Sequence, residues 1–195
     1  MALRAVVFDV GETLVDETGM WERAADAAGV PRFTLMGVLG GLAARGEHHD
    51  CVWQLLGIAR PASTWLPDEV YPDALPRLRA LRSAGLRVCA VGNTPREAEE
   101  ALRQHVEVLG SSGRWGAAKP APAFFERIIA AIGLPAHEIA YVGDRVDNDV
   151  RPARAAGMFA VHIRRGPWGY LQAGADEADA GIDSLAELPR VVAHV

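Results

Sequence analysis

The feature that most constrains the fold is a regular alternation of strand and helix patterns that begins after residue 72. Short apolar runs typical of buried strands occur at 86–91, 106–109, 138–143, 159–165 and 179–182. Helical patterns lie between them, at 73–84, 95–105, 121–133 and 147–156. Parallel strands need long crossovers, which are usually helices, so this alternation predicts an α/β fold with a doubly wound parallel sheet covered on both faces.

The N-terminal part of the chain adds one more strand and then departs from this alternation. Residues 4–8, RAVVF, are β-branched and apolar and predict a buried strand that ends at Asp9. From residue 16 to 70 the apolar residues have helical spacing, interrupted by glycines and prolines. We therefore expect an α/β core made of 1–15 and 71–195, with a small helical insert after the first strand. Ser184 and Glu187 form a capping-box pattern that predicts the start of a last helix.

Length and charge exclude several classes of protein. A chain of 195 residues suits one domain with a small insert. Its formal charge of -5 and the absence of a basic cluster argue against a nucleic-acid partner. No run approaches the roughly 20 apolar residues of a membrane span, and the N-terminus lacks signal-peptide features, so we expect a cytoplasmic protein. Cys51 and Cys89 match no metal or redox spacing and are expected to be reduced thiols. Nothing in the pattern indicates an oligomeric state.

Polar residues gather at the predicted strand ends. Asp9 and Asp144 each end a strand, Asn93 and Thr94 follow another, and Lys119 precedes a helix. In a doubly wound sheet, ligands bind beyond the carboxyl ends of the strands, so we expect these residues at one rim. Lys119 is also the single lysine among the 20 lysine and arginine residues, which suggests a specific use of its compact ammonium.

The two aspartates and the lysine together suit phosphoryl chemistry. Mg²⁺ usually binds one or two protein carboxylates and completes its shell with water and substrate oxygens. A carboxylate aligned with phosphorus can form an acyl phosphate, and a lysine can neutralise the phosphoryl oxygens. Either aspartate alone would more often be a turn or helix-cap residue, so the prediction depends on the combination.

Four segments resemble, in order, the motifs of the haloacid dehalogenase superfamily of hydrolases: VVFDVGETLVD, VGN, KPAPAFFERIIAAIG and YVGDRVDNDVRPARAAGM. The resemblance implies a Rossmann-like core, with the insert 16–70 as a short helical cap over the site. It also implies that Asp9 is the nucleophile and that a small phosphorylated molecule is the substrate. The Mg²⁺ ligands would be Asp9, the Gly11 carbonyl and Asp144.

The resemblance assigns supporting roles to three further residues. Thr13 would orient Asp9, and Lys119 would bind both the nucleophile and the phosphate. Asp149 would hold Lys119 or a water on the metal, which places it among the candidate metal residues.

The chain departs from the family at two positions. Phosphatases of the family usually carry a general-acid aspartate where this chain has Gly11. Losing a positioned general acid lowers the rate by about 10²- to 10⁴-fold. The neighbouring Glu12 is a candidate substitute if its side chain turns into the cleft. The phosphate-binding hydroxyl before Asn93 is replaced by Gly92, so we expect the backbone amides of Gly92 and Asn93 to bind the anion. Thr94 starts a second capping box, Thr94-Pro95-Arg96-Glu97, and its hydroxyl is expected to cap that helix.

Two hypotheses follow from these residues. The first is a Mg²⁺-dependent phosphatase, with low activity because of Gly11. The second is a catalytically impaired relative that binds metal and phosphate in a regulatory role. A phosphonate hydrolase needs a cap lysine that this chain lacks, and a dehalogenase in the strict sense usually has an aromatic residue at position 11. In the cap, residues 47–50 (EHHD) are expected to be a solvated helix start rather than a metal site, and Trp21, Trp53 and Trp65 are expected to pack the helices.

Overall fold

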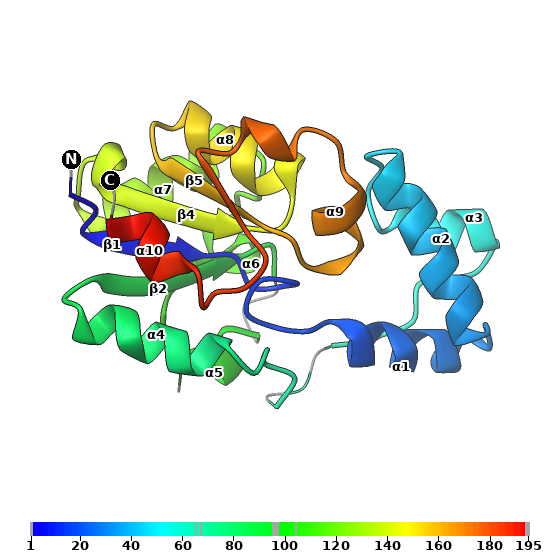
Figure 1. The fold of residues 1–195 in the computed structure, drawn as a ribbon. Coiled ribbons are helices and arrows are strands. Elements are labelled where there is room, and N and C mark those ends of the chain that lie inside the picture. Colours follow the sequence, from blue (N-terminus) through cyan, green and yellow to red (C-terminus); the bar gives the residue numbers. More distant parts are fainter. Residues whose placement is uncertain (1, 65, 67, 95–97, 104, 194–195) are drawn as a thin grey trace.

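A six-stranded parallel sheet forms the centre of the computed structural model, which describes residues 2–64, 66, 68–94, 98–103 and 105–193 (Figure 1). The strands are β1 (Ala5–Phe8), β2 (Arg87–Gly92), β3 (Glu107–Ser111), β4 (Ile139–Gly143), β5 (Phe159–Ile163) and β6 (Ala180–Ile182). Their order is β3-β2-β1-β4-β5-β6, and every neighbouring pair is parallel. This confirms the predicted doubly wound sheet. The chain winds outward from β1 on one side and from β4 on the other, so the order reverses beside β1.

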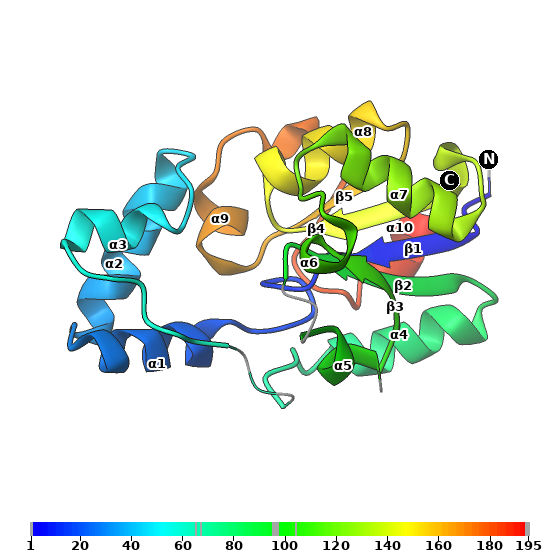
Figure 2. The same cartoon turned by 180° about the vertical axis from the view of Figure 1, so that it is seen from behind.

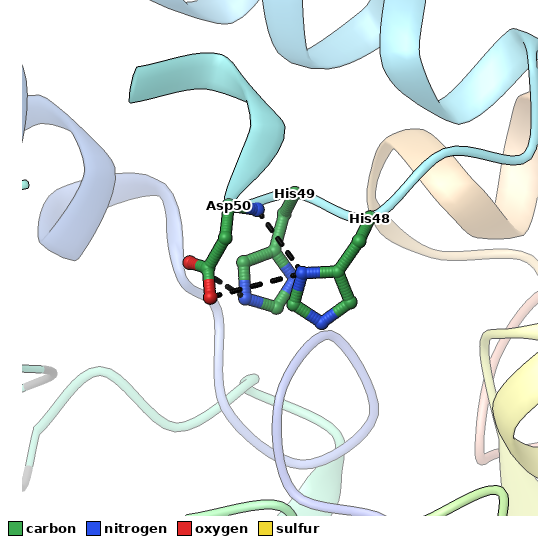
Figure 3. A group of neighbouring side chains, drawn as sticks. All are labelled: His48, His49 and Asp50. Atoms are coloured by element: carbon green, nitrogen blue, oxygen red, sulfur yellow. Dashed lines mark hydrogen bonds and ion pairs between the residues drawn. The ribbon is translucent and has the colours of Figure 1, made fainter. Parts of the chain in front are cut away.

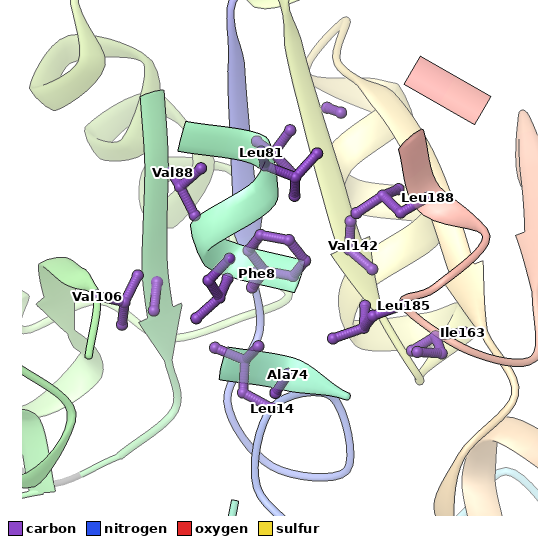
Figure 4. Close-up of a cluster of buried hydrophobic side chains, with 14 of the residues drawn as sticks. Phe8, Leu14, Ala74, Leu81, Val88, Val106, Val142, Ile163, Leu185 and Leu188 are labelled. Carbon is purple, nitrogen blue, oxygen red and sulfur yellow. The ribbon is translucent and has the colours of Figure 1, made fainter. Parts of the chain in front are cut away.

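Helices cover both faces of the sheet (Figure 2). One face carries α4 (Ala74–Ser83), α5 (Ala98–Arg103) and α10 (Leu188–Ala193), and the other carries α7 (Pro122–Ile132) and α8 (Arg151–Ala155). Side chains of β1 alternate between the two cores. Val6 and Phe8 join the first cluster, shown in Figure 4, whereas Ala5 and Val7 join the second. This period of two explains why a run of four apolar residues is buried completely.

The remaining elements of the core are short. They are α6 (Ser112–Trp115), α9 (Gly166–Leu171), the 3₁₀ turns η1 (Ala136–Glu138) and η3 (Ala175–Glu177), and the π-helix η2 (Val146–Val150). The sequence predicted neither α6 nor α9, and it predicted one regular helix at 147–156, where η2 in fact leads into α8. The last helix begins at Leu188, because Ser184 first makes a turn in which Ser184 N donates to Glu187 Oε1 and Ala186 N donates to Ser184 Oγ.

The helices of residues 16–70 lie beyond the carboxyl ends of the strands (Figure 1). They are α1 (Thr18–Ala28), α2 (Arg32–Ala44) and α3 (Cys51–Leu56), and they share a hydrophobic cluster of their own. Trp53 is buried in this cluster and Trp21 packs against it, as predicted, whereas Trp65 lies outside the described residues. The core contributes one buried side chain to the cluster, Trp168 of α9. Both cysteines are free thiols.

Within the described residues, no single helix is long and apolar enough to span a membrane; α1 and α2 pass that test only as a pair, bent by 119°.

Candidate active site

Asp9 lies at the point where the strand order reverses. Its backbone N–H donates to Val142 O at 2.9 Å, which extends the pairing of β1 with β4 by one residue. The chain then turns sharply, because the amides of Leu14 and Val15 both donate to Val10 O at 2.9 Å. This turn leaves the Asp9 side chain almost buried at the base of a cavity of about 590 Å³.

Lys119 binds Asp9 directly. Its Nζ lies 2.7 Å from Asp9 Oδ1 and 2.6 Å from Asp149 Oδ1. The backbone of Lys119 is fixed by Asn93, whose Nδ2 donates to Lys119 O at 2.9 Å and whose Oδ1 accepts from Lys119 N at 2.8 Å. The Asn93 side chain therefore positions the lysine, and only its backbone amide remains as a candidate for phosphate binding.

Asp144 directly follows β4, and Asp149 belongs to the π-helix η2 that comes next. Ligand atoms of Asp9, Asp144 and Asp149 lie within 4.8 Å of one another. The oxygens of Asp149 accept hydrogen bonds from Lys119 Nζ, Tyr141 Oη at 3.0 Å and Arg145 N at 3.1 Å. Single π-helical turns occur frequently at functional sites. Here the π-helix brings Asp149 close to the end of β4, so that a methyl group on Gly143 would overlap the Asp149 side chain.

The three carboxylates Asp9, Asp144 and Asp149 outnumber the one ammonium group, Lys119, that lies among them. Burial raises the pKa of Asp9 to about 6, although Lys119 opposes this shift. Burial, with Asp149 and Asp9 nearby, raises the pKa of Asp144 well above its ordinary value. Burial alone would lower the pKa of Lys119, but its pairs with Asp149 and Asp9 raise it. Three buried carboxylates facing one ammonium suit a divalent cation that prefers oxygen ligands, so the residues present fit Mg²⁺.

Thr13 does not make the contact expected of it, and the contact expected of Thr94 lies outside the described residues. Thr13 is buried at the same edge, but its Oγ1 has no hydrogen-bond partner among the described residues, so the expected bond to Asp9 is not formed. Thr94 precedes residues 95–97, and these lie outside the described residues together with the predicted capping box. Gly92 ends β2 and is buried beside Val10, where its lack of a side chain is needed: an added methyl group would lie 3.0 Å from Val10 Cγ2.

Glu12 lines the cavity, but its carboxylate is already engaged. Tyr71 Oη donates to Glu12 Oε2 at 2.5 Å, and the backbone N–H of Glu17 donates to Glu12 Oε1 at 3.0 Å. Glu12 also has a left-handed backbone, with φ of 51°, and its side chain packs against Gly166.

Glu17 is a residue of this site that the sequence did not single out. Its carboxylate lies against Gly11, where a methyl group would overlap Glu17 Oε1. Burial, with Glu12 and Asp9 nearby, raises the pKa of Glu17 to about 8. Six positions separate the two residues in the chain, and only the sharp turn after β1 brings them together, so no local motif could have revealed the pair.

Residues of the insert close the other side of the cavity. His48, His49 and Asp50 line it, together with Trp168 of α9. Ligand atoms of His48, His49 and Asp50 lie within 4.8 Å of one another. Figure 3 shows the three side chains facing one another. Asp50 is already paired with Arg60 at 2.6 Å, and its backbone N–H donates to His48 Nδ1 at 3.2 Å. These contacts agree with the expectation of a helix start better than with a metal site.

Residues 3–157 match the family model of haloacid dehalogenase-like hydrolases. The chain belongs to this family. Its six-stranded core and the segments that resemble the four motifs lie mainly within the matched region, so the family resemblance noted in the sequence is confirmed.

Curated relatives of this chain include named phosphatases. It is 34% identical over 132 residues to glyceraldehyde 3-phosphate phosphatase of Methanocaldococcus jannaschii, which covers 64% of this chain and 57% of the relative. It is 37% identical over 131 residues to the enzyme of the same name from Methanopyrus kandleri, with 63% and 56% covered. Phosphoserine phosphatase of Thermus thermophilus is 34% identical over 103 residues, with 50% and 41% covered. The chain therefore spans little more than half the length of the first two relatives and less than half the length of the third.

Solved structures share the fold of this chain over almost its whole length. The L-2-haloacid dehalogenase RSc1362 superposes with a TM-score of 0.76 at 21% identity, covering 99% of this chain and 100% of that one. YfnB from Bacillus subtilis, a putative HAD-hydrolase bound to magnesium, gives a TM-score of 0.74 at 16% identity, with 98% and 99% covered. At these identities the likeness establishes the fold alone.

Proposed function

We propose that the chain is a magnesium-dependent phosphatase that hydrolyses a small phosphate ester through a phosphorylated Asp9. The observation that supports this most strongly is the contact of Asp9 with Lys119 at 2.7 Å, beside Asp144 and at the base of the cavity. The phosphatase names of the curated relatives support the substrate class.

In this proposal an Asp9 oxygen attacks phosphorus, and the bond from phosphorus to the ester oxygen breaks. Water then attacks the phosphorus of the acyl phosphate, which releases inorganic phosphate and restores Asp9. Lys119 neutralises charge on the phosphoryl oxygens. In this proposal the backbone amides of Gly92 and Asn93 bind the same oxygens, and Thr13 Oγ1, which is buried without a hydrogen-bond partner among the described residues, binds near Asp9.

Asp9, Asp144 and the Gly11 carbonyl would hold Mg²⁺, which when bound supplies positive charge beside the phosphoryl group. Asp149 belongs to the same carboxylate group, and its hydrogen bond from Lys119 supports a role in holding the lysine rather than the metal. Residues 16–70 act as a cap that screens the substrate from water, over a core of residues 1–15 and 71–195.

The test compares the wild type with Asp9→Asn, using p-nitrophenyl phosphate and an alkyl phosphate in Mg²⁺ and in EDTA. Turnover that requires Mg²⁺ and falls to background in Asp9→Asn is the expected result. Asp183→Asn is the matched control, because Asp183 is exposed and paired with Arg164 on the surface. Equal rates for wild type and Asp9→Asn would contradict the proposal, and halide release from L-2-chloropropionate without Mg²⁺ would favour a dehalogenase.

The second candidate is a protein that binds metal and phosphate without turnover, favoured by the absence of a carboxyl group at Gly11. Mg²⁺-dependent binding of inorganic phosphate, measured by calorimetry, together with background rates for the wild type would support this alternative.

A further inference from the structure

The proposed reaction leaves an oxygen that needs a proton. When an alkyl phosphate breaks, the departing oxygen becomes an alkoxide unless an acid protonates it, and a positioned acid contributes about 10²- to 10⁴-fold in rate. This inference rests on the proposed function, because only that reaction needs the proton. The contacts within the cavity indicate which group supplies it.

Most carboxyl groups that line the cavity are already engaged. Asp9 and Asp144 belong to the nucleophile and metal group. The others already accept hydrogen bonds or ion pairs from neighbouring groups: Glu12 from Tyr71 and the Glu17 amide, Asp16 from the Thr18 amide at 2.9 Å, Glu22 from Arg32 at 2.8 Å, and Asp50 from Arg60 at 2.6 Å. Among the described cavity-lining acids, this leaves Glu17.

The Glu17 carboxylate does not cap its own helix, and one of its oxygens faces the site. Glu17 is the residue before α1, a position where a side chain often caps the helix, yet its carboxylate makes no capping hydrogen bond. Its one hydrogen-bond donor among the described residues is Trp21 Nε1, 3.4 Å from Oε2. Oε1 lies against Gly11, in the space that a side chain at position 11 would occupy.

The backbone of Glu17 is fixed where it enters the site. Its N–H donates to Glu12 Oε1, and Glu12 is held in turn by Tyr71 Oη. Gly166 lets Glu12 lie this close, because a methyl group there would be 2.5 Å from Glu12 Cγ. Glu12, the predicted substitute acid, therefore acts as a positioning residue for Glu17.

We propose that Glu17 is the general acid of this hydrolase, and that it replaces in space the side chain that Gly11 lacks. The Glu17 carboxyl group gives its proton to the ester oxygen as the bond to phosphorus breaks, which releases a neutral alcohol. The resulting carboxylate then takes a proton from the water that attacks the acyl phosphate. One water is consumed, and Glu17 returns to its starting form.

The test compares Glu17→Gln with the wild type on two substrates that differ in leaving group. An alkyl phosphate needs the proton, whereas p-nitrophenolate is a good leaving group and needs it much less. We expect kcat for the alkyl phosphate to fall by about 10²-fold or more, and the loss on p-nitrophenyl phosphate to be at least tenfold smaller. Glu22→Gln is the matched control, because Glu22 lines the same cavity from α1 but is paired with Arg32.

A second variant keeps the test independent of any fault in folding. In Glu17→Ala the space beside Gly11 is open, so adding Gly11→Asp places a carboxyl group there without overlap. We expect kcat for the alkyl phosphate to be at least tenfold higher in this double variant than in Glu17→Ala. In the wild-type background Gly11→Asp must displace Glu17, and we expect it to give no such gain.

Each result is decisive. Equal losses on the two substrates, no loss at all, or the same selective loss in Glu22→Gln would overturn the role of Glu17. A selective loss in His48→Asn in place of Glu17→Gln would overturn it as well, because His48 lines the same cavity. If the wild type shows no Mg²⁺-dependent turnover on either substrate, the proposed function fails and this inference fails with it, whereas wild-type turnover with equal losses overturns the inference alone.

Discussion

Three buried carboxylates and one ammonium group lie together beyond the ends of β1 and β4. Asp9, Asp144 and Asp149 are each less than a tenth exposed, and Lys119 is the cation between two of them. Asp144 is the member without a pair to Lys119, and its raised pKa reflects burial beside two like charges. An uncompensated buried charge lowers the free energy of unfolding, so this site trades stability for the ability to bind a cation.

Mg²⁺ should therefore stabilise the wild type. At a concentration 100 times its Kd, a ligand that binds only the folded state adds about 2.7 kcal/mol to the free energy of unfolding. We expect the Tm to rise on adding MgCl₂ and to return with EDTA. Asp144→Asn should remove this response and raise the Tm of the metal-free protein, while the surface variant Asp183→Asn should keep the Mg²⁺ response. An unchanged Mg²⁺ response in Asp144→Asn would show that Asp144 is not a ligand.

The sequence predicted Asp9, Asp144 and Lys119 but missed Glu17. Asp9 and Asp144 were predictable because the parallel sheet gathers the carboxyl ends of its strands at one rim, and Lys119 because it is the single lysine and precedes a helix of the core. Glu17 was not, because its place depends on the turn after β1 and on the direction in which the chain leaves the core. The role of the Asn93 side chain was not predicted either, because its hydrogen bonds to the backbone of Lys119 join two segments far apart in the chain.

At the scale of elements, the contact between the insert and the core depends on α9, a helix that was not predicted from the sequence. α9 contains Pro167 and Gly169 within six residues, a composition typical of a turn. Its Trp168 nevertheless enters the cluster of α1 to α3 and donates from Nε1 to Glu47 O at 3.3 Å. His49 meets the Trp168 ring edge-on, with centroids 6.1 Å apart, and so takes part in the same contact.

This contact should weaken in acid. Burial, with His48 nearby, lowers the pKa of His49 from 6.5 to about 4; Arg145 and Arg60 act in the same direction, and Asp50 opposes them. Between these two pH values the unfolded chain binds a proton that the folded protein does not, so the free energy of unfolding falls as pH drops from 6.5 towards 4. In urea titrations at pH 7 and 4.5, His49→Gln should lose less stability on acidification than the wild type does. An equal loss in both proteins would contradict this prediction.

At the scale of the whole molecule, the chain crosses between insert and core at two adjacent points. Val15 and Val70 form an antiparallel bridge, flanked by hydrogen bonds from Asp16 N to Glu69 O and from Tyr71 N to Leu14 O, both 2.9 Å long. On the insert side, Arg23 pairs with Glu69 at 2.7 Å and ties α1 to the returning segment. The hydrophobic clusters on the two sides of this crossing are separate, and Trp168 is the buried core residue in the cluster of the insert.

Because the two crossing segments are already paired, a two-residue Asn-Gly turn should be able to join Asp16 to Glu69 in place of residues 17–68. We expect the shortened chain to unfold cooperatively, and its Tm to rise with MgCl₂, since Asp9, Gly11 and Asp144 all lie in the core. Adding Asp144→Asn to the shortened chain should abolish that rise. Hydrolysis of an alkyl phosphate should be lost, because the deletion removes Glu17 and the cover of the cavity. These results would assign metal binding to the core and proton transfer to the insert. A folded, shortened chain whose Tm does not change with Mg²⁺ would show instead that the metal site needs both the core and the insert.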